Sequence, residues 1–439
     1  MVFGTTILGS NPSAPAKIMK KFIENLTSTI NKYFFPFYKN KDIKLLFKNL
    51  EYGKSNDKEV AMFVGGCVRN FLQSKKIGDI DVATIFTPDE LKKKLKNSKF
   101  KVIDTGLDHG SVTVVSDNTK LEVTTLRKDI KTDGRYAEIE TIDDWKEDSK
   151  RRDFTINAIY LNKKGKIFDP QQGISDLKNN IVKFIGDPQT RIEEDFLRII
   201  RFLRFSIQYN SSLEHSTVQA LKLKLNGIKS LSKERVLSEL LKILKLKNFF
   251  KIIDNKEIVE IFILVFPEFQ NIQRLKNFNL VKNHIENSEI LLLSILLIDL
   301  KSNHEYFSHK YKVSNKIHDN LYLLGNKFKE SKTDKEFFKK NLKFKLYNIG
   351  VKNLKILFCL HLLDRNKITL KEVNFFQIIE KISIPKFPFD GNFLLKKGIK
   401  EGKKVGIILK EAEETWIQNN FNLTSQDLEL IIKKYTISN

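Results

Sequence analysis

Residues 65–84 read GGCVRNFLQSKKIGDIDVAT, and they place two aspartates, Asp79 and Asp81, one residue apart inside an apolar run. On a strand, residues i and i+2 point to the same face, so both carboxylates project together while Ile80 and Val82 point into the core. Two such carboxylates repel each other unless a cation lies between them, and oxygen ligands of this kind suit Mg²⁺. The pair is therefore compatible with a magnesium site, although in isolation a solvated strand edge is the better explanation, and the surrounding residues decide between the two.

The residues around this pair favour a nucleotide site. Gly65 and Gly66 lie between an expected strand and an expected helix, where glycine exposes backbone N–H groups that stabilise an anionic phosphate. Arg69 lies one turn into that helix, within reach of a triphosphate. Glu122, in the expected strand LEVTTL, offers a third carboxylate from a neighbouring strand. The combination of diglycine, arginine and paired aspartates is much more specific than any one of them.

The overall charge favours a polyanionic partner. The chain of 439 residues carries 77 Lys and Arg against 53 Asp and Glu, a net charge of +24, with a pI near 9.6. Such an excess is typical of proteins that bind nucleic acid, although heavy use of lysine is an alternative explanation. Of the 12 arginines, 10 lie between positions 69 and 235. The planar guanidinium group can bind a phosphate or a base edge through two hydrogen bonds, so we expect the functional site within residues 65–235.

Several other classes of protein fit the sequence poorly. Two cysteines, Cys67 and Cys359, argue against a disulfide framework and suit a reducing compartment. The longest apolar run, ILLLSILLIDL from Ile290, is too short to span a bilayer and predicts a buried helix. The N-terminus shows neither a secretory apolar region nor an arginine-rich presequence, and residues 1–16 are interpreted as a disordered leader or as a misplaced start. We therefore expect a cytoplasmic protein with no membrane segment.

The periodicity predicts an α+β fold followed by a helical arm. From about residue 60 to 180, AMFVGG, DIDVATIF and FTINAIYLN are typical of strands, and PDELKKKLKN of a helix with proline near its start. GSVTVVS and KLEVTTL predict a hairpin around Asp117 and Asn118. After Asp187 and Pro188 the pattern is helical to the end, apart from the proline-rich ISIPKFPFDG.

The segment EEDFLRIIRFLRF suggests recognition of an anion. On one continuous helix, Asp195 and Arg198 would share a face, with Arg201 and Arg204 close to it. An Asp–Arg pair within the helix, worth about 0.2–0.5 kcal/mol, is the structural alternative. Three arginines spaced by three, without matching acids, make an unusual salt-bridge face. We therefore favour an anionic ligand on this face.

Asp195 and Arg198 have the chemistry needed to select bases. A carboxylate only accepts hydrogen bonds and a guanidinium only donates them. Cytosine and adenine present an amino donor beside a ring-nitrogen acceptor, which this pair complements, whereas uracil and guanine present a carbonyl beside a ring N–H. Misaligned polar groups in a dry pocket cost roughly 1–3 kcal/mol each. The pair would thus admit CTP and ATP and reject UTP and GTP.

A second basic segment, RRDFTINAIY, begins at Arg151. Arg151 and Arg152 are suited to bind phosphate or ribose, and Asp153 to orient a guanidinium or accept from a sugar hydroxyl. A basic entry to a strand is the alternative explanation. The segment alone does not decide between the two.

Six ordered motifs resemble one enzyme family. FVGGCVRNFL with IGDIDVAT, TGLDHGSVTV, LEVTTLR, RRDFTINAIYL, FDPQQGISDLKNNIVKFIGDP and RIEEDFLRIIRFLRF have the order and approximate spacing of class II tRNA nucleotidyltransferases, the CCA-adding enzymes and their poly(A) polymerase relatives. The resemblance covers about residues 60–245, including SKERVLSELLKIL, and returns weakly at FPFDGNFLLKKGIKEGKKVGIILKEAEETWI. Asn70 departs from the aspartate that the family usually has after the arginine, which puts its contribution to the site in doubt.

The resemblance implies a polymerase-β-like nucleotidyltransferase head with a small mixed sheet, followed by an all-α neck, body and tail. The expected activity is template-independent addition of C, C and A to the 3′ end of tRNA from CTP and ATP, by two-metal nucleotidyl transfer. The tRNA would be held by its acceptor and T arms. The predicted divisions are a leader and N-terminal helix over 1–50, the head over 51–183, the neck over 184–245, the body over 246–345 and a tRNA-binding tail over 346–439.

The resemblance and the residue chemistry together define the predicted site. The resemblance implies that Asp79 and Asp81 carry Mg²⁺ and that Asp195 and Arg198 read the base; Glu122 is a third candidate catalytic carboxylate. The predicted nucleotide-binding residues are Gly65, Gly66, Arg69, Arg151, Arg152, Asp153, Asn157, Asp195, Arg198, Arg201 and Arg204.

Three other functions stay open from the sequence. A poly(A) polymerase usually carries an arginine-rich signature shortly after the paired-aspartate strand, and residues 87–114 resemble the CCA-adding type instead. An enzyme limited to CC or to A remains an alternative, because the segment KDIKTDGRYAEI, which could govern the switch between the two nucleotides, is not decisive. A basic RNA-binding protein without catalysis is the alternative from another class.

Overall fold

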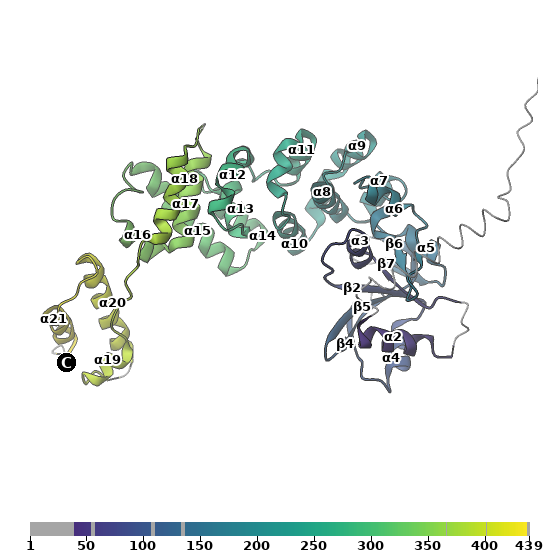
Figure 1. The fold of residues 1–439 in the computed structure, drawn as a ribbon, viewed down its shortest axis with the longest axis horizontal. Coiled ribbons are helices and arrows are strands. Elements are labelled where there is room, and N and C mark those ends of the chain that lie inside the picture. Colours follow the sequence, from purple (N-terminus) through teal and green to yellow (C-terminus); the bar gives the residue numbers. More distant parts are fainter. Residues whose placement is uncertain are drawn as a thin grey trace, which may run out of the picture. The chain divides into compact units, whose positions relative to one another are not determined.

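The computed structural model describes residues 39–53, 58–106, 110–132, 137–365, 367–400 and 402–436. It divides the chain into two compact units, Met1–Val265 and Phe266–Asn439. The first unit contains the sheets and the second is helical, so the predicted α+β class with a helical arm is confirmed (Figure 1). The predicted leader lies outside the described residues. The finer boundaries between head, neck, body and tail stay predictions.

The head is built on a mixed seven-stranded sheet in the order β3-β4-β5-β2-β1-β8-β9. β2 and β5 are parallel, and every other paired strand in this sheet is antiparallel. The predicted hairpin is confirmed, because β4 and β5 pair directly around Asp117 and Asn118. The strands are β1 (Ala61–Val64), β2 (Ile80–Thr84), β3 (Lys101–Gly106), β4 (Ser111–Ser116), β5 (Thr119–Thr125), β8 (Tyr160–Leu161) and β9 (Ile167–Phe168).

A separate two-stranded sheet, β6 (Arg127–Thr132) with β7 (Ala137–Thr141), follows β5 along the chain. It contains most of the segment KDIKTDGRYAEI, which we associated with the choice between CC and A. The tip of that segment, residues 133–136, lies outside the described residues. That association therefore stays a prediction.

Two layers of side chains hold the sheet. On one face, Phe63 of β1 packs against Phe47 of α2, with ring centroids 4.9 Å apart. On the other face, Met62 and Val64 belong to an apolar cluster that also includes Tyr160. The proline near the start of α4 follows Thr87, which caps that helix together with Glu90. The helices of the head are α2 (Lys41–Glu51), α3 (Gly66–Leu72), α4 (Pro88–Leu95), α5 (Trp145–Lys150) and α6 (Gly173–Lys178).

The segment FTINAIYLN forms less strand than predicted. Thr155–Asn157 is a 3-10 turn, and only Tyr160–Leu161 pairs as β8. The hydroxyl of Thr155 donates to Asp176 at 2.6 Å, and the amide of Asn157 donates to the carbonyl of Phe154 at 2.9 Å. These local bonds replace the ladder bonds of a longer strand.

The helices that complete the first unit correct one prediction. The segment EEDFLRIIRFLRF is not one helix, because Asp195 has extended backbone angles (φ −156°, ψ 106°) between α7 and α8. Its carboxylate accepts from the amide of Leu197 at 3.1 Å, which caps the start of α8, a position that aspartate favours. Asp195 and Arg198 therefore do not share one helical face. The helices are α7 (Pro188–Glu194), α8 (Leu197–Tyr209), α9 (His215–Lys224), α10 (Lys233–Leu244) and α11 (Lys256–Val265).

Helices joined by loops make up the described residues of the second unit, which contain no strand. The apolar run from Ile290 forms α13 with every residue of Leu291–Leu297 buried, so the predicted buried helix is confirmed. Within the part of the chain that the structure describes, no single helix has both the length and the apolar composition of a membrane span, and only the bent pair α16 and α17 meets those criteria when joined across a 112° bend. The helices are α12 (Leu275–Val281), α13 (Glu289–Leu297), α14 (Asn303–Tyr311), α15 (Asn315–Thr333), α16 (Leu342–Ile349), α17 (Val351–Leu363), α18 (Leu370–Lys381), α19 (Gly391–Lys396), α20 (Lys403–Gln418) and α21 (Ser425–Thr436).

Candidate active site

The paired aspartates lie at the start of β2, in the middle of the sheet. Asp79 directly precedes the strand, and Asp81 is its second residue. Asp81 is paired with Val64 at the end of β1 and with Glu122 on β5. The structure therefore places Asp81 between the glycine turn and Glu122. A Cβ atom added to Gly65 would lie only 3.3 Å from the Oδ2 atom of Asp81.

The surroundings of Asp81 disfavour its negative charge. Burial raises its pKa to about 6, and the carboxylates of Glu122 and Asp79 act in the same direction, whereas Arg152 and Arg69 oppose the shift. Two further acids beside a partly buried carboxylate make a site that a divalent cation would stabilise. Three metal-ligating side chains do not converge anywhere among the described residues. A cation on these aspartates would thus need further oxygen ligands, which Mg²⁺ commonly takes from phosphates and water.

The glycine turn leads from β1 into α3 and positions Arg69. Gly65 has φ +72°, a backbone conformation that favours glycine. The side chain of Arg69 is buried, with 8% of the residue exposed, and its NH1 donates to the Oδ1 of Asn157. Its Nε has no hydrogen-bond partner among the described residues. No described carboxylate forms an ion pair with this guanidinium, which leaves a desolvated positive charge beside the turn.

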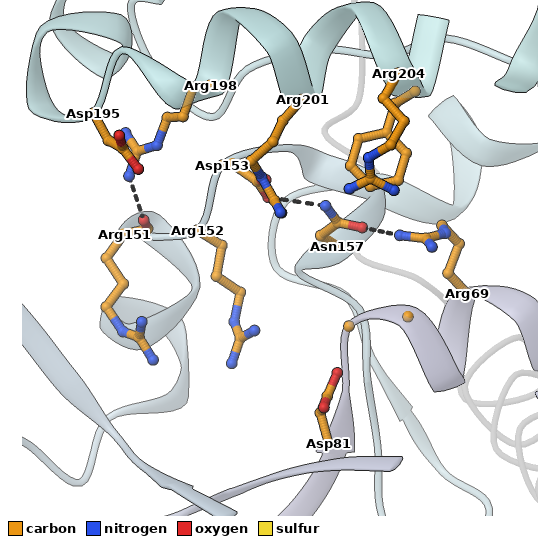
Figure 2. A pocket seen from close by; sticks show the side chains of 13 residues that line it. Arg69, Asp81, Arg151, Arg152, Asp153, Asn157, Asp195, Arg198, Arg201 and Arg204 are labelled. Atoms are coloured by element: carbon orange, nitrogen blue, oxygen red, sulfur yellow. Dashed lines mark hydrogen bonds and ion pairs between the residues drawn. The ribbon is translucent and has the colours of Figure 1, made fainter. Parts of the chain in front are cut away.

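One pocket of about 420 Å³ collects the predicted nucleotide-binding residues. All 11 of them line it, together with Asp81 and Phe205. Figure 2 shows Asp195, Arg198, Arg201 and Arg204 along one side of this pocket and Asp81 across from them. Six arginines against three aspartates make the lining basic. Asp79 and Glu122 are not among its lining residues.

A second pocket of about 420 Å³ adjoins the first. Asp81, Arg151 and Arg152 line both pockets, and Glu122 lines only the second. Asp81 thus faces two basic cavities at once. This arrangement suits a reaction that joins two anionic molecules at one carboxylate site.

A buried carboxylate, which the sequence analysis missed, holds Arg151 and Arg152. Asp148 on α5 is fully buried, and its Oδ1 accepts from the Nε of Arg151 at 2.7 Å. Its Oδ2 accepts from Arg152 at 3.2 Å and from the hydroxyl of Tyr160 at 2.7 Å. Burial opposes ionisation of Asp148, but the charges of Arg152 and Arg151 outweigh it and lower its pKa to about 2. The spacing of three and four residues before the two arginines was the available signal.

The arginines of α8 have acidic partners, so the expectation of a face without matching acids is wrong. Arg201 donates through Nε to Asp153 at 2.8 Å, and Arg204 donates through Nε to Glu239 of α10 at 2.8 Å. Arg198 pairs with Glu194 at 2.5 Å. Asp153 and Glu239 lie far from these arginines in the sequence, so a helical projection of EEDFLRIIRFLRF does not show them, whereas the spacing of four between Glu194 and Arg198 was visible.

Asp153 and Asn157 connect this row of arginines to α3. Asp153 accepts from Arg201 and, through Oδ1, from the Nδ2 of Asn157 at 2.9 Å. Asn157 in turn accepts from Arg69. Burial opposes ionisation of Asp153, but Arg201 outweighs it and lowers the pKa of Asp153 well below its usual range. The network fixes Asp153 as an anion within the pocket wall.

Asp195 and Arg198 are held by other groups and not by each other. Besides capping α8, Asp195 accepts through Oδ2 from Arg235 of α10 at 2.8 Å. Arg198 donates through NH1 to the carbonyl of Arg191 at 2.7 Å. Each side chain is thereby fixed at the pocket wall before any ligand arrives. Arg235 and Glu239 lie in the motif SKERVLSELLKIL, for which the sequence analysis gave no role.

Comparison with known proteins identifies the family. Residues 61–183 match the Poly A polymerase head domain. The chain is 30% identical over 378 residues to CCA tRNA nucleotidyltransferase 1, mitochondrial, of Danio rerio, covering 83% of this chain and 85% of the relative. It is 42% identical over 190 residues to the CCA-adding enzyme of Staphylococcus haemolyticus, covering 43% of this chain and 46% of that enzyme.

Solved structures share the fold. The CCA-adding enzyme of Bacillus stearothermophilus in complex with CTP matches with a TM-score of 0.62 at 20% identity, covering 91% of this chain and 98% of that one. The Thermotoga maritima CCA-adding enzyme complexed with tRNA matches with a TM-score of 0.58 at 20% identity, covering 90% of this chain and 96% of that one. The sequence relationship over most of both chains, together with this common fold, confirms the resemblance drawn from the motifs. The chain belongs to the family of class II tRNA nucleotidyltransferases, the CCA-adding enzymes and their poly(A) polymerase relatives.

Proposed function

We propose that this chain adds C, C and A to the 3′ end of tRNA without a nucleic-acid template, using CTP and ATP. The 3′-hydroxyl oxygen of the RNA forms a bond to the α-phosphorus of the nucleotide, and pyrophosphate leaves. The relatives that span most of the chain are CCA-adding enzymes of vertebrate mitochondria and of bacteria. Solved structures of the same fold hold CTP, ATP or tRNA. Poly(A) synthesis is less well supported, because only the head matches a domain of that name.

The observation that carries the proposal is the buried guanidinium of Arg69, which forms no salt bridge with any described carboxylate. A buried charge without an ion-pair partner is costly unless a ligand completes it. Arg69 is 8% exposed, lines the pocket, and leaves its Nε without a partner. The glycine turn beside it adds backbone N–H groups, so this end of the pocket suits the triphosphate.

Asp79 and Asp81 are the proposed ligands of a divalent cation, with Glu122 as a nearby third carboxylate. The raised pKa of Asp81 supports this assignment, because neighbouring acids would then share a cation. Such an ion supplies Lewis-acid polarisation of phosphoryl oxygens and favours deprotonation of an attacking hydroxyl. Mg²⁺ is the proposed ion, because it is commonly bound by only one or two protein carboxylates and takes its other ligands from phosphate oxygens and water.

Asp195 and Arg198 are the proposed base-reading pair. Capping of α8 and the bond from Arg235 fix the carboxylate, and the carbonyl of Arg191 fixes the guanidinium. The Asp195 carboxylate as acceptor and the Arg198 guanidinium as donor are thus held at the pocket wall, where they can complement cytosine and adenine without moving. Arg201, Arg204, Asp153 and Asn157 line the same pocket, and hydrogen bonds link Arg201, Asp153 and Asn157 to Arg69.

The proposed partner is tRNA, bound in part by lysines of the second unit through its phosphates. Such binding weakens steeply with salt, because each neutralised phosphate releases counterions. The proposed localisation is cytoplasmic; the relatives include mitochondrial as well as bacterial enzymes, so localisation is tested separately by fluorescence microscopy of the tagged protein.

The test is to incubate the purified protein with tRNA that lacks its terminal triplet, supply all four nucleotides and Mg²⁺, and sequence the 3′ ends. We expect CCA ends with all nucleotides and CC ends with CTP alone. Runs of A would identify a poly(A) polymerase instead. Products that stop after CC would identify a CC-adding enzyme, and addition of A only to tRNA that already ends in CC would identify an A-adding enzyme. RNA binding without any extension would identify a non-catalytic protein.

A further inference from the structure

One aromatic ring in the pocket lies against three arginines. Phe205 on α8 is 2% exposed and lines the pocket. The guanidinium carbons of Arg204, Arg69 and Arg201 lie 4.2, 4.8 and 5.8 Å from its ring centroid. All three distances fall within the range of a cation–π interaction, which extends to about 6 Å.

The three arginines differ in their other partners. Arg204 has Glu239 and Arg201 has Asp153. Arg69 has the amide of Asn157 and no ion-pair partner among the residues that the structure describes. The ring of Phe205, like the amide of Asn157 and the charge of Asp81, therefore helps to offset the desolvation of the Arg69 charge, and it connects α3 of the head to α8.

An aromatic ring stabilises a cation in a way that a carboxylate cannot. The face of the ring attracts the positive charge through its quadrupole, yet it neither cancels the charge nor accepts the N–H groups in strong hydrogen bonds. A carboxylate in the same place would neutralise Arg69 and compete with a phosphate for its donors. Phe205 thus leaves the positive charge of Arg69 available to attract an anion in the pocket.

We propose that Phe205 is a positioning residue for the triphosphate: it holds the guanidinium of Arg69, still charged, where the phosphates of CTP and ATP bind. The inference rests on the proposed function and adds to it a residue that acts through Arg69. Because the phosphates of CTP and ATP are identical, the contribution of Phe205 is the same for both nucleotides. Base selection, which lies with other residues, does not depend on it.

The experiment weakens the quadrupole of the Phe205 ring in steps, with little change in the size of the side chain. Phenylalanine analogues with one, two and three ring fluorines at position 205 weaken the quadrupole stepwise, and Phe205→Leu removes the ring. For CMP addition and for AMP addition, we expect KM to rise at each step of fluorination and to reach about tenfold in Phe205→Leu, equivalent to about 1.4 kcal/mol. The kcat stays within about twofold, because binding and not the bond-forming step is affected.

The matched control is the same series at Phe202, on the same helix. Phe202 is 1% exposed and stacks on Phe184 with centroids 5.4 Å apart. Fluorination at position 202 leaves KM unchanged, and Phe202→Leu lowers Tm as Phe205→Leu does. A flat KM across the Phe205 series, or equal trends at both positions, overturns the inference. Failure of the unmodified protein to add CMP overturns the proposed function instead, so the two failures are distinguishable.

Discussion

Asp81 and Glu122 occupy paired positions on the parallel strands β2 and β5, and no described salt bridge neutralises either carboxylate. Burial raises the pKa of Asp81 to about 6, and the charge of Glu122 is the next largest cause. In the ligand-free protein this pairing lowers the stability of the sheet at neutral pH. Binding sites often retain such strain, because the ligand that relieves it is the one that the site has to bind.

Replacing Asp81 should stabilise the protein. The folded state holds a proton on Asp81 more tightly than the unfolded chain does, since the pKa rises from its ordinary value near 4 to about 6. Above pH 6 the ionised carboxylate thus costs stability, and the cost disappears as the pH falls below 4. In chelator, we expect Asp81→Asn to raise the free energy of unfolding by roughly 1–3 kcal/mol at pH 7.5 and by almost nothing at pH 4.

Denaturant unfolding at the two pH values measures this difference. Asp104→Asn is the matched control, because Asp104 is a half-exposed acid on β3 that pairs with Lys92 at 2.9 Å. We expect no stabilisation from it at either pH. Equal effects of Asp81→Asn at pH 7.5 and pH 4 would contradict the assignment of a raised pKa.

Removal of the acids should separate catalysis from RNA binding. With Asp79→Asn and Asp81→Asn together, we expect incorporation of CMP and AMP to be lost while the Kd for tRNA in a filter-binding assay stays unchanged. The unmodified protein should gain thermal stability on addition of Mg²⁺ with nucleotide, and the double variant should not. Retained incorporation in the double variant, or equal activity in excess chelator, would contradict the proposed cation site.

Removal of the Arg69 charge should have opposite effects on stability and on binding. Arg69→Met keeps most of the side-chain volume and eliminates a buried guanidinium that has no ion-pair partner in the described part of the chain. We expect Tm without nucleotide to stay the same or rise, while KM for CTP and ATP rises at least about tenfold, or about 1.4 kcal/mol. Arg204→Met is the comparison, because it leaves Glu239 buried and unpaired and should lower Tm. A lower Tm in Arg69→Met than in Arg204→Met would contradict this account.

The sequence predicted the pocket better than the elements that build it. Diglycine, the paired aspartates and the arginine-rich segments carry chemistry in their residue types and spacing, and 11 predicted residues line one pocket. The break at Asp195 was not predicted, because hydrophobic periodicity continues across it and only a cap bond to Leu197 ends the pattern. Likewise, local hydrogen bonds shortened the expected strand at FTINAIYLN.

Partners from distant parts of the chain could not be predicted from local patterns. Glu239 lies 35 residues after Arg204, and Asp153 lies 48 residues before Arg201. Nothing in the spacing of either acid identifies its arginine, because the contact depends on how α8 packs on its neighbours. Asp148 differs from these two acids. The sequence shows that it lies three and four residues before two arginines, but it does not show that Asp148 is buried.

Neutralising Asp148 should destabilise the head. Asp148→Asn leaves Arg151 and Arg152 without their shared counterion, and loss of one partner of a buried ion pair costs about 3–5 kcal/mol. The folded pKa of Asp148 is lowered to about 2 from its usual value near 4. Its contribution to stability is therefore present above pH 4 and is lost as the pH falls through 2. Urea unfolding should show this loss in the unmodified protein and not in Asp148→Asn; parallel curves would contradict it.

Exchange of the Asp195 carboxylate for an amide should change which bases are accepted. Asp195→Asn keeps an oxygen that can cap α8 and places an N–H₂ donor where the second oxygen was; it loses the bond from Arg235 and gains a donor that can complement a carbonyl of uracil or guanine. We expect the ratio of kcat/KM for CTP over UTP to fall by about tenfold or more, since a mismatched polar contact is worth roughly 1–3 kcal/mol.

Asp195→Ala should relax selection too, but with a loss of about 1 kcal/mol in stability from the missing cap. Asp187→Asn, which alters the cap of α7 away from the pocket, is the matched control and should leave base selection unchanged. Single-nucleotide incorporation with each of the four nucleotides measures the ratio, and unchanged rejection of UTP and GTP in both Asp195 variants would remove this residue from base reading.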